Sequence, residues 1–192
     1  MWEYQGMIVP EPPPGRDTPE RAETDHVAGD TALLVRLPEI GPLIATWFDR
    51  GPHDGVGAHV TVLVPFLPAD QIDEAVIERL TGLLRGFEAF DVRFSRTGRF
   101  PTVLYLKPEP EQTFRAMTDA VYGAWPDYPP YQGKYEDSTP HLTVLIDAGA
   151  DEYDEAQAAV EQLLPLEARA VAVDLLVFDG DRWSLLRRLP LG

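Results

Sequence analysis

The sequence contains no cysteine, which excludes disulfide bonds, thiolate nucleophiles and zinc sites with cysteine ligands. It has no run of about 20 apolar residues, the length that a membrane-spanning helix requires. Its first five residues, Met1 to Gln5, lack the basic start and apolar core of a secretory signal. We therefore expect a cytoplasmic protein with no membrane partner.

Positive charge is scarce in this chain. The 192 residues include 16 lysines and arginines against 32 aspartates and glutamates, which gives a formal net charge of −16. Lysine and arginine bind long nucleic acids by neutralising phosphates, so this acidity disfavours extended RNA or DNA unless a basic cleft is focused locally. A small phosphorylated substrate suits the charge better than a polymer. Acidity that serves only solubility is the simpler alternative.

The first 29 residues differ in composition from the rest of the chain. They combine a proline-rich stretch, Val9 to Gly15, with a polar and acidic run, and neither suits a helix or a central strand. We expect a disordered or loosely docked tail at 1–29, in which His26 is dispensable, and a single domain at 30–192. Hydrophobic residues make up 44% of the chain, enough for a core in that domain.

Strand-like and helix-like segments alternate along the domain, in an order that occurs twice. The expected elements are strands at 31–38, 59–66, 90–96, 102–106 and 141–146, helices at 39–49, 70–84, 109–125 and 151–164, and a closing hairpin of 168–178 and 183–189. We expect Asp70 to cap its helix, Gly98 to lie in a turn, and Asp179 and Gly180 to turn the hairpin. This order predicts an α+β or α/β domain with an internal duplication.

One four-residue pattern occurs in both halves, as His59-Val60-Thr61-Val62 and His141-Leu142-Thr143-Val144. Side chains two positions apart in a strand share a face. Each strand is therefore expected to bury its two apolar residues and to present a histidine and a threonine together. A single copy of the pattern is typical of an ordinary strand, whereas two copies in equivalent places indicate a shared site.

Two imidazoles suit the cleavage of a phosphodiester. A neutral imidazole can take a proton from the attacking water while an imidazolium gives one to the departing oxygen, and the ordinary histidine pKa of about 6.5 makes both forms accessible. The Thr61 and Thr143 hydroxyls can donate hydrogen bonds to the non-bridging oxygens. The alternatives are two structural histidines, or a metal site with Asp54 or Asp137 as a further ligand.

The paired motifs resemble those of the two-histidine (2H) phosphoesterase superfamily, most of all its bacterial 2′-5′ RNA ligase branch, over about Thr31 to Leu189. The resemblance implies a bilobal α+β fold, in which two pseudo-symmetric antiparallel sheets surround a central cleft and helices lie outside. It implies metal-independent hydrolysis of a 2′,3′-cyclic phosphate or a related small nucleotide or RNA-end phosphodiester, without a cofactor. The implied catalytic residues are His59, Thr61, His141 and Thr143. Which histidine is the acid and which the base stays open.

Two other activities remain compatible with the same fold. One is the joining or splitting of 2′-5′ RNA linkages, and the other is a non-catalytic module that only binds nucleotides. In each case the expected partner is a small nucleotide or an RNA terminus, and we expect a monomer.

Six residues near the motifs are candidates for substrate binding. An aromatic ring can stack on a nucleobase, and a cation can grip phosphate. These candidates are Phe66 after the first motif, Arg99 and Phe100 beside Gly98, and Tyr131, Lys134 and Tyr135 in the loop before the second motif. Core packing is the alternative for Phe66, and a solvated surface is the alternative for Arg99 and the loop. We expect His53 to be a surface residue.

Overall fold

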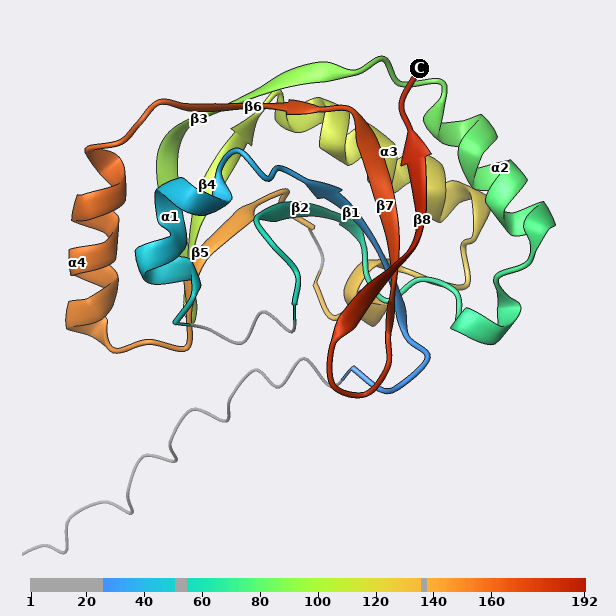
Figure 1. The fold of residues 1–192 in the computed structure, drawn as a ribbon, viewed down its shortest axis with the longest axis horizontal. Coiled ribbons are helices and arrows are strands. Elements are labelled where there is room, and N and C mark those ends of the chain that lie inside the picture. Colours follow the sequence, from blue (N-terminus) through green and yellow to red (C-terminus); the bar gives the residue numbers. More distant parts are fainter. Residues whose placement is uncertain (1–25, 51–54, 136–137) are drawn as a thin grey trace, which may run out of the picture.

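The structure is a computed structural model that describes residues 26–50, 55–135 and 138–192 (Figure 1). Within these residues, no helix is long and apolar enough to cross a membrane. In chain order the elements are β1 (Thr31–Arg36), α1 (Gly41–Phe48), β2 (His59–Leu63), the 3-10 helix η1 (Ala69–Gln71), α2 (Glu74–Leu84), β3 (Phe90–Phe100), β4 (Val103–Glu109), α3 (Glu111–Ala124), the 3-10 helix η2 (Pro130–Gly133), β5 (Leu142–Ile146), α4 (Ala150–Glu161), β6 (Leu166–Ala170), β7 (Ala172–Phe178) and β8 (Trp183–Pro190).

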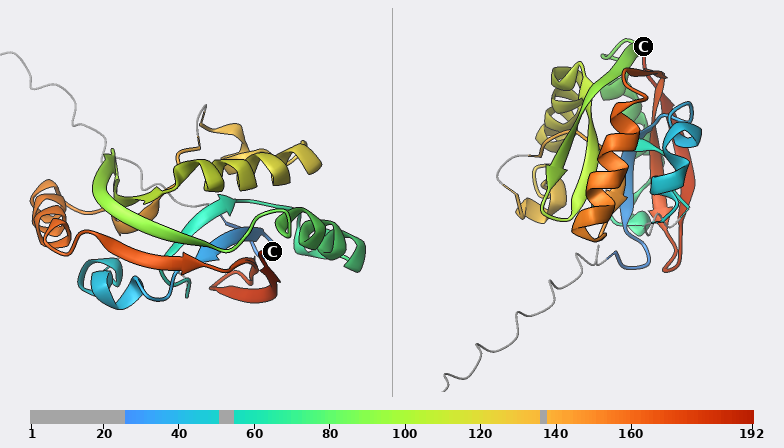
Figure 2. Two further views of the ribbon diagram at one scale, coloured as in Figure 1. Left: turned by 90° about the horizontal axis from the view of Figure 1, so that it is seen from above. Right: turned by 90° about the vertical axis from the view of Figure 1, so that its left-hand side faces the viewer.

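The strands form two four-stranded antiparallel sheets, ordered β2-β1-β7-β8 and β5-β4-β3-β6. The helices lie around the outside of the sheets (Figure 2). Helix α3 contacts β2 of the first sheet, and α1 contacts β5 of the second. The expected bilobal α+β fold with two antiparallel sheets is therefore confirmed.

Strands cross between the two halves of the chain. Strand β3 comes from the first half but lies in the second sheet, where it pairs with β4 and β6. Strand β7 comes from the second half but pairs with β1 in the first sheet. Only Val171 separates β6 from β7, so the single strand expected at 168–178 is in fact two strands in different sheets.

Each motif strand lies at the edge of its sheet and buries the residues that the alternation predicts. Val60, Val62, Leu142 and Val144 are at most 1% exposed and belong to a core that runs through both halves. The histidines and threonines between them are only half-buried. The core thus fixes the backbone of both motifs and turns their polar side chains toward the space between the sheets.

Two local expectations were wrong, and one is confirmed. Asp73, not Asp70, caps α2, because its side chain accepts a hydrogen bond of 2.9 Å from the Val76 amide. Gly98 lies within β3 rather than in a turn, which is displaced to residues 101–102. The hairpin does turn at Asp179 and Gly180, where Gly180 has a φ of +106°.

Candidate active site

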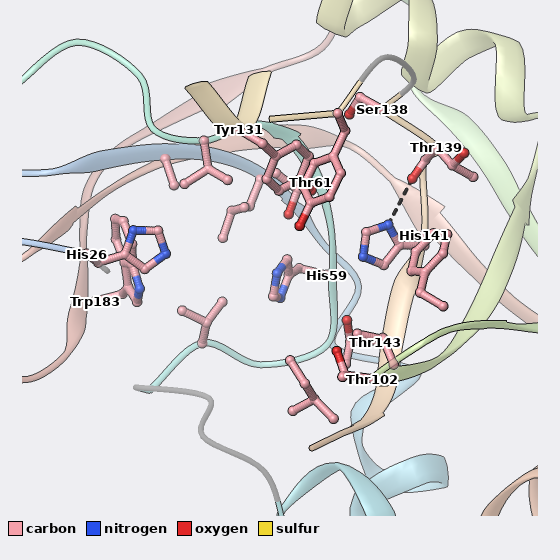
Figure 3. Close-up of a pocket in the computed structure, with 18 of the residues that line it drawn as sticks. His26, His59, Thr61, Thr102, Tyr131, Ser138, Thr139, His141, Thr143 and Trp183 are labelled. Carbon is pink, nitrogen blue, oxygen red and sulfur yellow. Dashed lines mark hydrogen bonds between the residues drawn. The ribbon is translucent and has the colours of Figure 1, made fainter. Parts of the chain in front are cut away.

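A cavity of about 600 Å³ is lined by residues of both sheets (Figure 3). The histidine and threonine of each motif line it, so four residues from two distant segments share one space. Its described lining residues are His26, Ala32, Leu34, Val56, His59, Thr61, Val64, Phe100, Pro101, Thr102, Val103, Tyr131, Tyr135, Ser138, Thr139, His141, Thr143, Ile146 and Trp183.

Both motif histidines are held by the same type of hydrogen bond. Nδ1 of His59 lies 2.8 Å from the carbonyl oxygen of Gly57, and Nδ1 of His141 lies 2.8 Å from that of Thr139. A carbonyl oxygen can only accept, so Nδ1 carries the proton in both rings. In a neutral ring this leaves Nε2 as the basic nitrogen. The two imidazoles are therefore prepared for the same proton chemistry at Nε2.

Two aromatic rings surround His141 in the second sheet. The Phe100 ring meets the imidazole edge-on with centroids 5.2 Å apart, and the Tyr105 ring lies 5.5 Å away at 63°. Loss of solvent around the imidazole lowers the pKa of His141, against a smaller opposing effect of the Thr139 carbonyl. His141 is consequently neutral at pH 7.

Tyr105 was not predicted as a site residue, and its position depends on a glycine. Its ring stacks on Phe100 at 4.4 Å and lies directly over Gly98, its partner on β3. A Cβ added at Gly98 would lie 2.6 Å from Oη of Tyr105 and closer still to its ring. A glycine inside a strand marks such close approaches, but the sequence alone does not indicate which ring lies over it.

Two tyrosines from the loop before β5 reach the first motif. The Tyr131 amide donates a 2.7 Å hydrogen bond to the Val64 carbonyl, and Thr61 lowers the pKa of the Tyr131 hydroxyl, against the larger effect of burial. Burial raises the pKa of Tyr131 to about 12. The Tyr135 ring meets that of Tyr131 edge-on at 5.5 Å. Tyr131, Tyr135 and Phe100 thus line the cavity among the six predicted substrate-binding residues.

The other three candidates lie away from the cavity. Phe66 is 2% exposed and packs edge-on against Trp125 in the core, which leaves no ring face for a nucleobase. Arg99 donates hydrogen bonds to Asp154 at 2.8 Å and to Gln157 at 2.6 Å, both on α4. Lys134 is exposed and does not line the cavity. The local pattern placed these residues near a motif but did not fix the direction of their side chains.

His26 and Trp183 line the cavity, although neither was predicted to do so. The two rings meet edge-on at 4.9 Å, and the turn that follows His26 is tied to β7 by a 2.8 Å bond from the Gly29 amide to the Phe178 carbonyl. His26 was expected to be dispensable. Both positions depend on contacts between the N-terminal segment and the last hairpin, which no local pattern in the sequence reveals.

The described residues contain no cluster of side chains that could bind a metal ion. No group of three or more His, Asp or Glu in residues 26–50, 55–135 and 138–192 is arranged to hold a metal ion. The proposed ligands Asp54 and Asp137, and also His53, lie outside the described residues.

The comparisons with known proteins agree with this architecture. The family model described as the 2′-5′ RNA ligase superfamily matches residues 37–182. No curated protein matches the chain in sequence.

Three solved structures share the fold at low identity. Escherichia coli LigT complexed with 3′-AMP has a TM-score of 0.57 and 17% identity, over 86% of this chain and 99% of that one. The protein TT0787 of Thermus thermophilus has a TM-score of 0.54 and 18% identity, over 84% and 97%. E. coli LigT complexed with NADP+ has a TM-score of 0.50 and 18% identity, over 85% and 98%.

Proposed function

Because this chain belongs to the 2′-5′ RNA ligase superfamily of two-histidine phosphoesterases, we propose that it is a metal-independent phosphodiesterase. Its substrate is a 2′,3′-cyclic phosphate or a related small nucleotide or RNA-end phosphodiester. One observation carries the proposal. His59 and His141 come from different sheets and line one cavity, and each directs Nδ1 to a main-chain carbonyl oxygen, which leaves Nε2 for proton transfer.

The lowered pKa of His141 supports the assignment of the two proton-transfer roles. A neutral imidazole accepts protons, so Nε2 of His141 takes a proton from the water that attacks phosphorus. The bond from phosphorus to one ring oxygen of the cyclic phosphate breaks. Protonated His59 gives its Nε2 proton to that oxygen, and the product is a phosphomonoester. The roles exchange in the reverse direction.

The threonines of the two motifs stabilise the charge on phosphate in this scheme. Thr61 and Thr143 project beside the histidines, two residues further along each strand, and line the same cavity. Their hydroxyls donate hydrogen bonds to the non-bridging oxygens, where negative charge is held in the transition state. Tyr131 lines the cavity together with Thr61.

A nucleotide substrate is supported by the structural relatives. LigT of E. coli has been crystallised with 3′-AMP and with NADP+, two nucleotides, in the fold that this chain shares. The cavity of this chain is lined by the aromatic rings of Phe100, Tyr131 and Trp183, on which a nucleobase can stack.

The test is hydrolysis of nucleoside 2′,3′-cyclic phosphates by the full chain, with and without EDTA. We expect turnover that survives EDTA and falls at least about a hundredfold in His59→Ala and in His141→Ala, because each variant loses one proton-transfer group. Glu78→Ala, on the exposed side of α2, is the control and keeps full activity. Activity abolished by EDTA would support the metal alternative. Binding without turnover would support a non-catalytic module, and joining of 2′-5′ linkages would support a ligase.

A further inference from the structure

The lining of the cavity carries almost no charge. None of its described lining residues is a lysine, arginine, aspartate or glutamate, so its polar groups are histidines, hydroxyls and main-chain atoms. Of the segments that are not described, 51–54 and 136–137 contain no lysine or arginine, whereas 1–25 contain Arg16 and Arg21. Among the described residues, the cavity therefore offers the imidazoles of His59 and His141 and neutral donors to one phosphate. It also holds the imidazole of His26, but no lysine or arginine for a second phosphate.

Two cations on strands that border the cavity are already paired with carboxylates. Arg36 lies opposite His59 in the register of β1 and β2, but its Nε donates a 2.5 Å hydrogen bond to Asp174. Lys107 on β4 forms a 2.8 Å ion pair with Glu111. With a net charge of −16, the surrounding protein disfavours any further phosphate on a substrate.

One side of the cavity is apolar and aromatic. Ala32, Leu34 and Val56 form a small buried cluster with Leu176, separate from the main core, and Val64 and Trp183 pack against it. All but Leu176 line the cavity. We call Ala32, Leu34, Val56, Val64 and Trp183, together with His26, the apolar compartment.

The apolar compartment lies next to the proposed phosphate position. Figure 3 shows His26 and Trp183 on one side of His59 and His141 on the other. A group attached to a phosphate between the histidines can therefore extend past His59 toward Trp183. The half-buried indole of Trp183 can support an aromatic base there, because base–aromatic stacking does not require charge. A cavity of about 600 Å³ has the size of sites that hold one small ligand.

We propose that the site is specific for a cyclic phosphodiester with a single negative charge, whose one nucleobase occupies the apolar compartment, and that it rejects substrates with additional phosphates. This inference rests on the proposed function, since it names the substrate class of the same site. The inference predicts that the site accepts a nucleoside 2′,3′-cyclic phosphate without a 5′-phosphate. It predicts that the site disfavours an RNA 3′ end, because each further nucleotide adds a phosphate.

The first experiment compares three substrates of the full chain: cytidine 2′,3′-cyclic phosphate, the same compound with a 5′-phosphate, and a trinucleotide that ends in a 2′,3′-cyclic phosphate. We expect kcat/KM to be at least about tenfold lower for the two substrates with extra phosphates. The difference should shrink at high salt, because screening weakens the repulsion. Equal or higher kcat/KM for the phosphorylated substrates would overturn the inference.

Binding provides a readout that is independent of turnover. Calorimetry on His141→Ala, a variant without the proposed base, measures the affinity for cytidine 2′,3′-cyclic phosphate with and without the 5′-phosphate. Absence of turnover in the native chain contradicts the proposed function. Tighter binding of the 5′-phosphorylated compound contradicts the inference, so the two failures are distinguishable.

A second experiment tests the apolar compartment itself. Trp183→Ala should raise KM for cytidine 2′,3′-cyclic phosphate at least about fivefold, Trp183→Phe should largely restore it, and both should leave glycerol 1,2-cyclic phosphate, which has no base, unchanged. Leu186→Ala, an exposed residue of the same strand β8, is the matched control. Equal losses on both substrates in Trp183→Ala would show that the indole does not hold the base.

Discussion

The Tyr131 amide donates a 2.7 Å hydrogen bond to the Val64 carbonyl, so a residue of the second half of the chain is tied to the end of the first motif strand. Tyr131 has a φ of 51°, in the left-handed region that non-glycine residues rarely adopt. Such strain is retained where the surrounding contacts enforce it, and here the bond from the Tyr131 amide to the Val64 carbonyl does so. Strain at this position is a sign that the placement of Tyr131 at the cavity, beside Thr61, has a function.

Tyr131→Phe should lower kcat by about three- to tenfold, with KM changed less than twofold. The variant removes the Tyr131 hydroxyl, whose hydrogen bonding to Thr61 or to phosphate would contribute about 0.5–1.5 kcal/mol, and it leaves the ring in place. Steady-state kinetics on a cyclic nucleotide measure the two constants. Tyr135→Phe is the comparison, because the Tyr135 ring lies edge-on beside that of Tyr131 in the same loop. A higher KM with unchanged kcat in Tyr131→Phe would instead indicate a role in binding.

Gly98→Ala should reduce kcat/KM at least about tenfold without unfolding the protein. The new Cβ would lie 2.6 Å from Oη of Tyr105, so the ring has to move away from His141 and Phe100. Circular dichroism checks the fold, and kinetics check the site. Gly82→Ala is the control because a Cβ there meets no atom within 4 Å. Native activity in Gly98→Ala would mean that the Tyr105 position is irrelevant.

The acidic limb of the pH–rate profile should lie below pH 6.5. Loss of solvent lowers the pKa of His141 below its ordinary value of about 6.5, so the proposed base stays neutral until the pH falls through that lower pKa. Phe100→Ser exposes the imidazole to water and should move the limb up toward pH 6.5. The profile of kcat/KM measures both limbs. If the acidic limb does not move in Phe100→Ser, it reports the titration of a group other than His141.

The same pKa shift predicts how stability depends on pH. The pKa of His141 is lower in the folded chain than in the unfolded chain, where it is about 6.5. Its contribution to stability is therefore complete above pH 6.5 and is lost as the pH falls through the folded pKa. Urea unfolding at pH 7.5 and pH 5 should show a smaller acid-induced loss in His141→Gln than in the native chain. Equal losses would contradict the shift.

Arg36→Met should destabilise the fold by about 2–3 kcal/mol, because its removal leaves the buried Asp174 carboxylate with only the more distant Arg188 guanidinium, 3.8 Å from Oδ1, as an ion-pair partner. Asp174 is 1% exposed; its Oδ2 accepts the 2.5 Å bond from Arg36, while its Oδ1 has no hydrogen-bond partner among the described residues. The double variant Arg36→Met, Asp174→Leu should recover most of the loss, as measured by urea unfolding. A double variant as unstable as the single one would show that the pair is not coupled.

Much of the fold and part of the site could be predicted from the sequence, for physical reasons that particular residues illustrate. Strand alternation predicted that Val60 and Val144 are buried and that the histidines share a face with the threonines. The pattern could not predict that β6 and β7 belong to different sheets, because residues 168–178 contain no glycine or proline and are apolar except for Arg169 and Asp174. That division is set by pairing with β3 and β1, which are distant in the chain.

The candidate site shows the same limit. The repeated motif predicted the four residues that meet in the cavity, since both copies are local patterns. Phe66 lies only a few residues after Thr61 but turns into the core, while Trp183 lies far away and reaches the cavity. The direction of a side chain beyond a strand end and the contacts of a distant hairpin depend on tertiary packing, which a single sequence does not encode in readable form.

The placement of β3 and β7 in sheets of the opposite half has a consequence for the chain as a whole. Neither half of the polypeptide contains all the strands of one sheet, so neither can complete its own hydrogen-bonded ladder. A nick at the 101–102 turn should therefore yield two fragments that are unfolded apart and reassemble on mixing, in contrast to a protein whose lobes are autonomous.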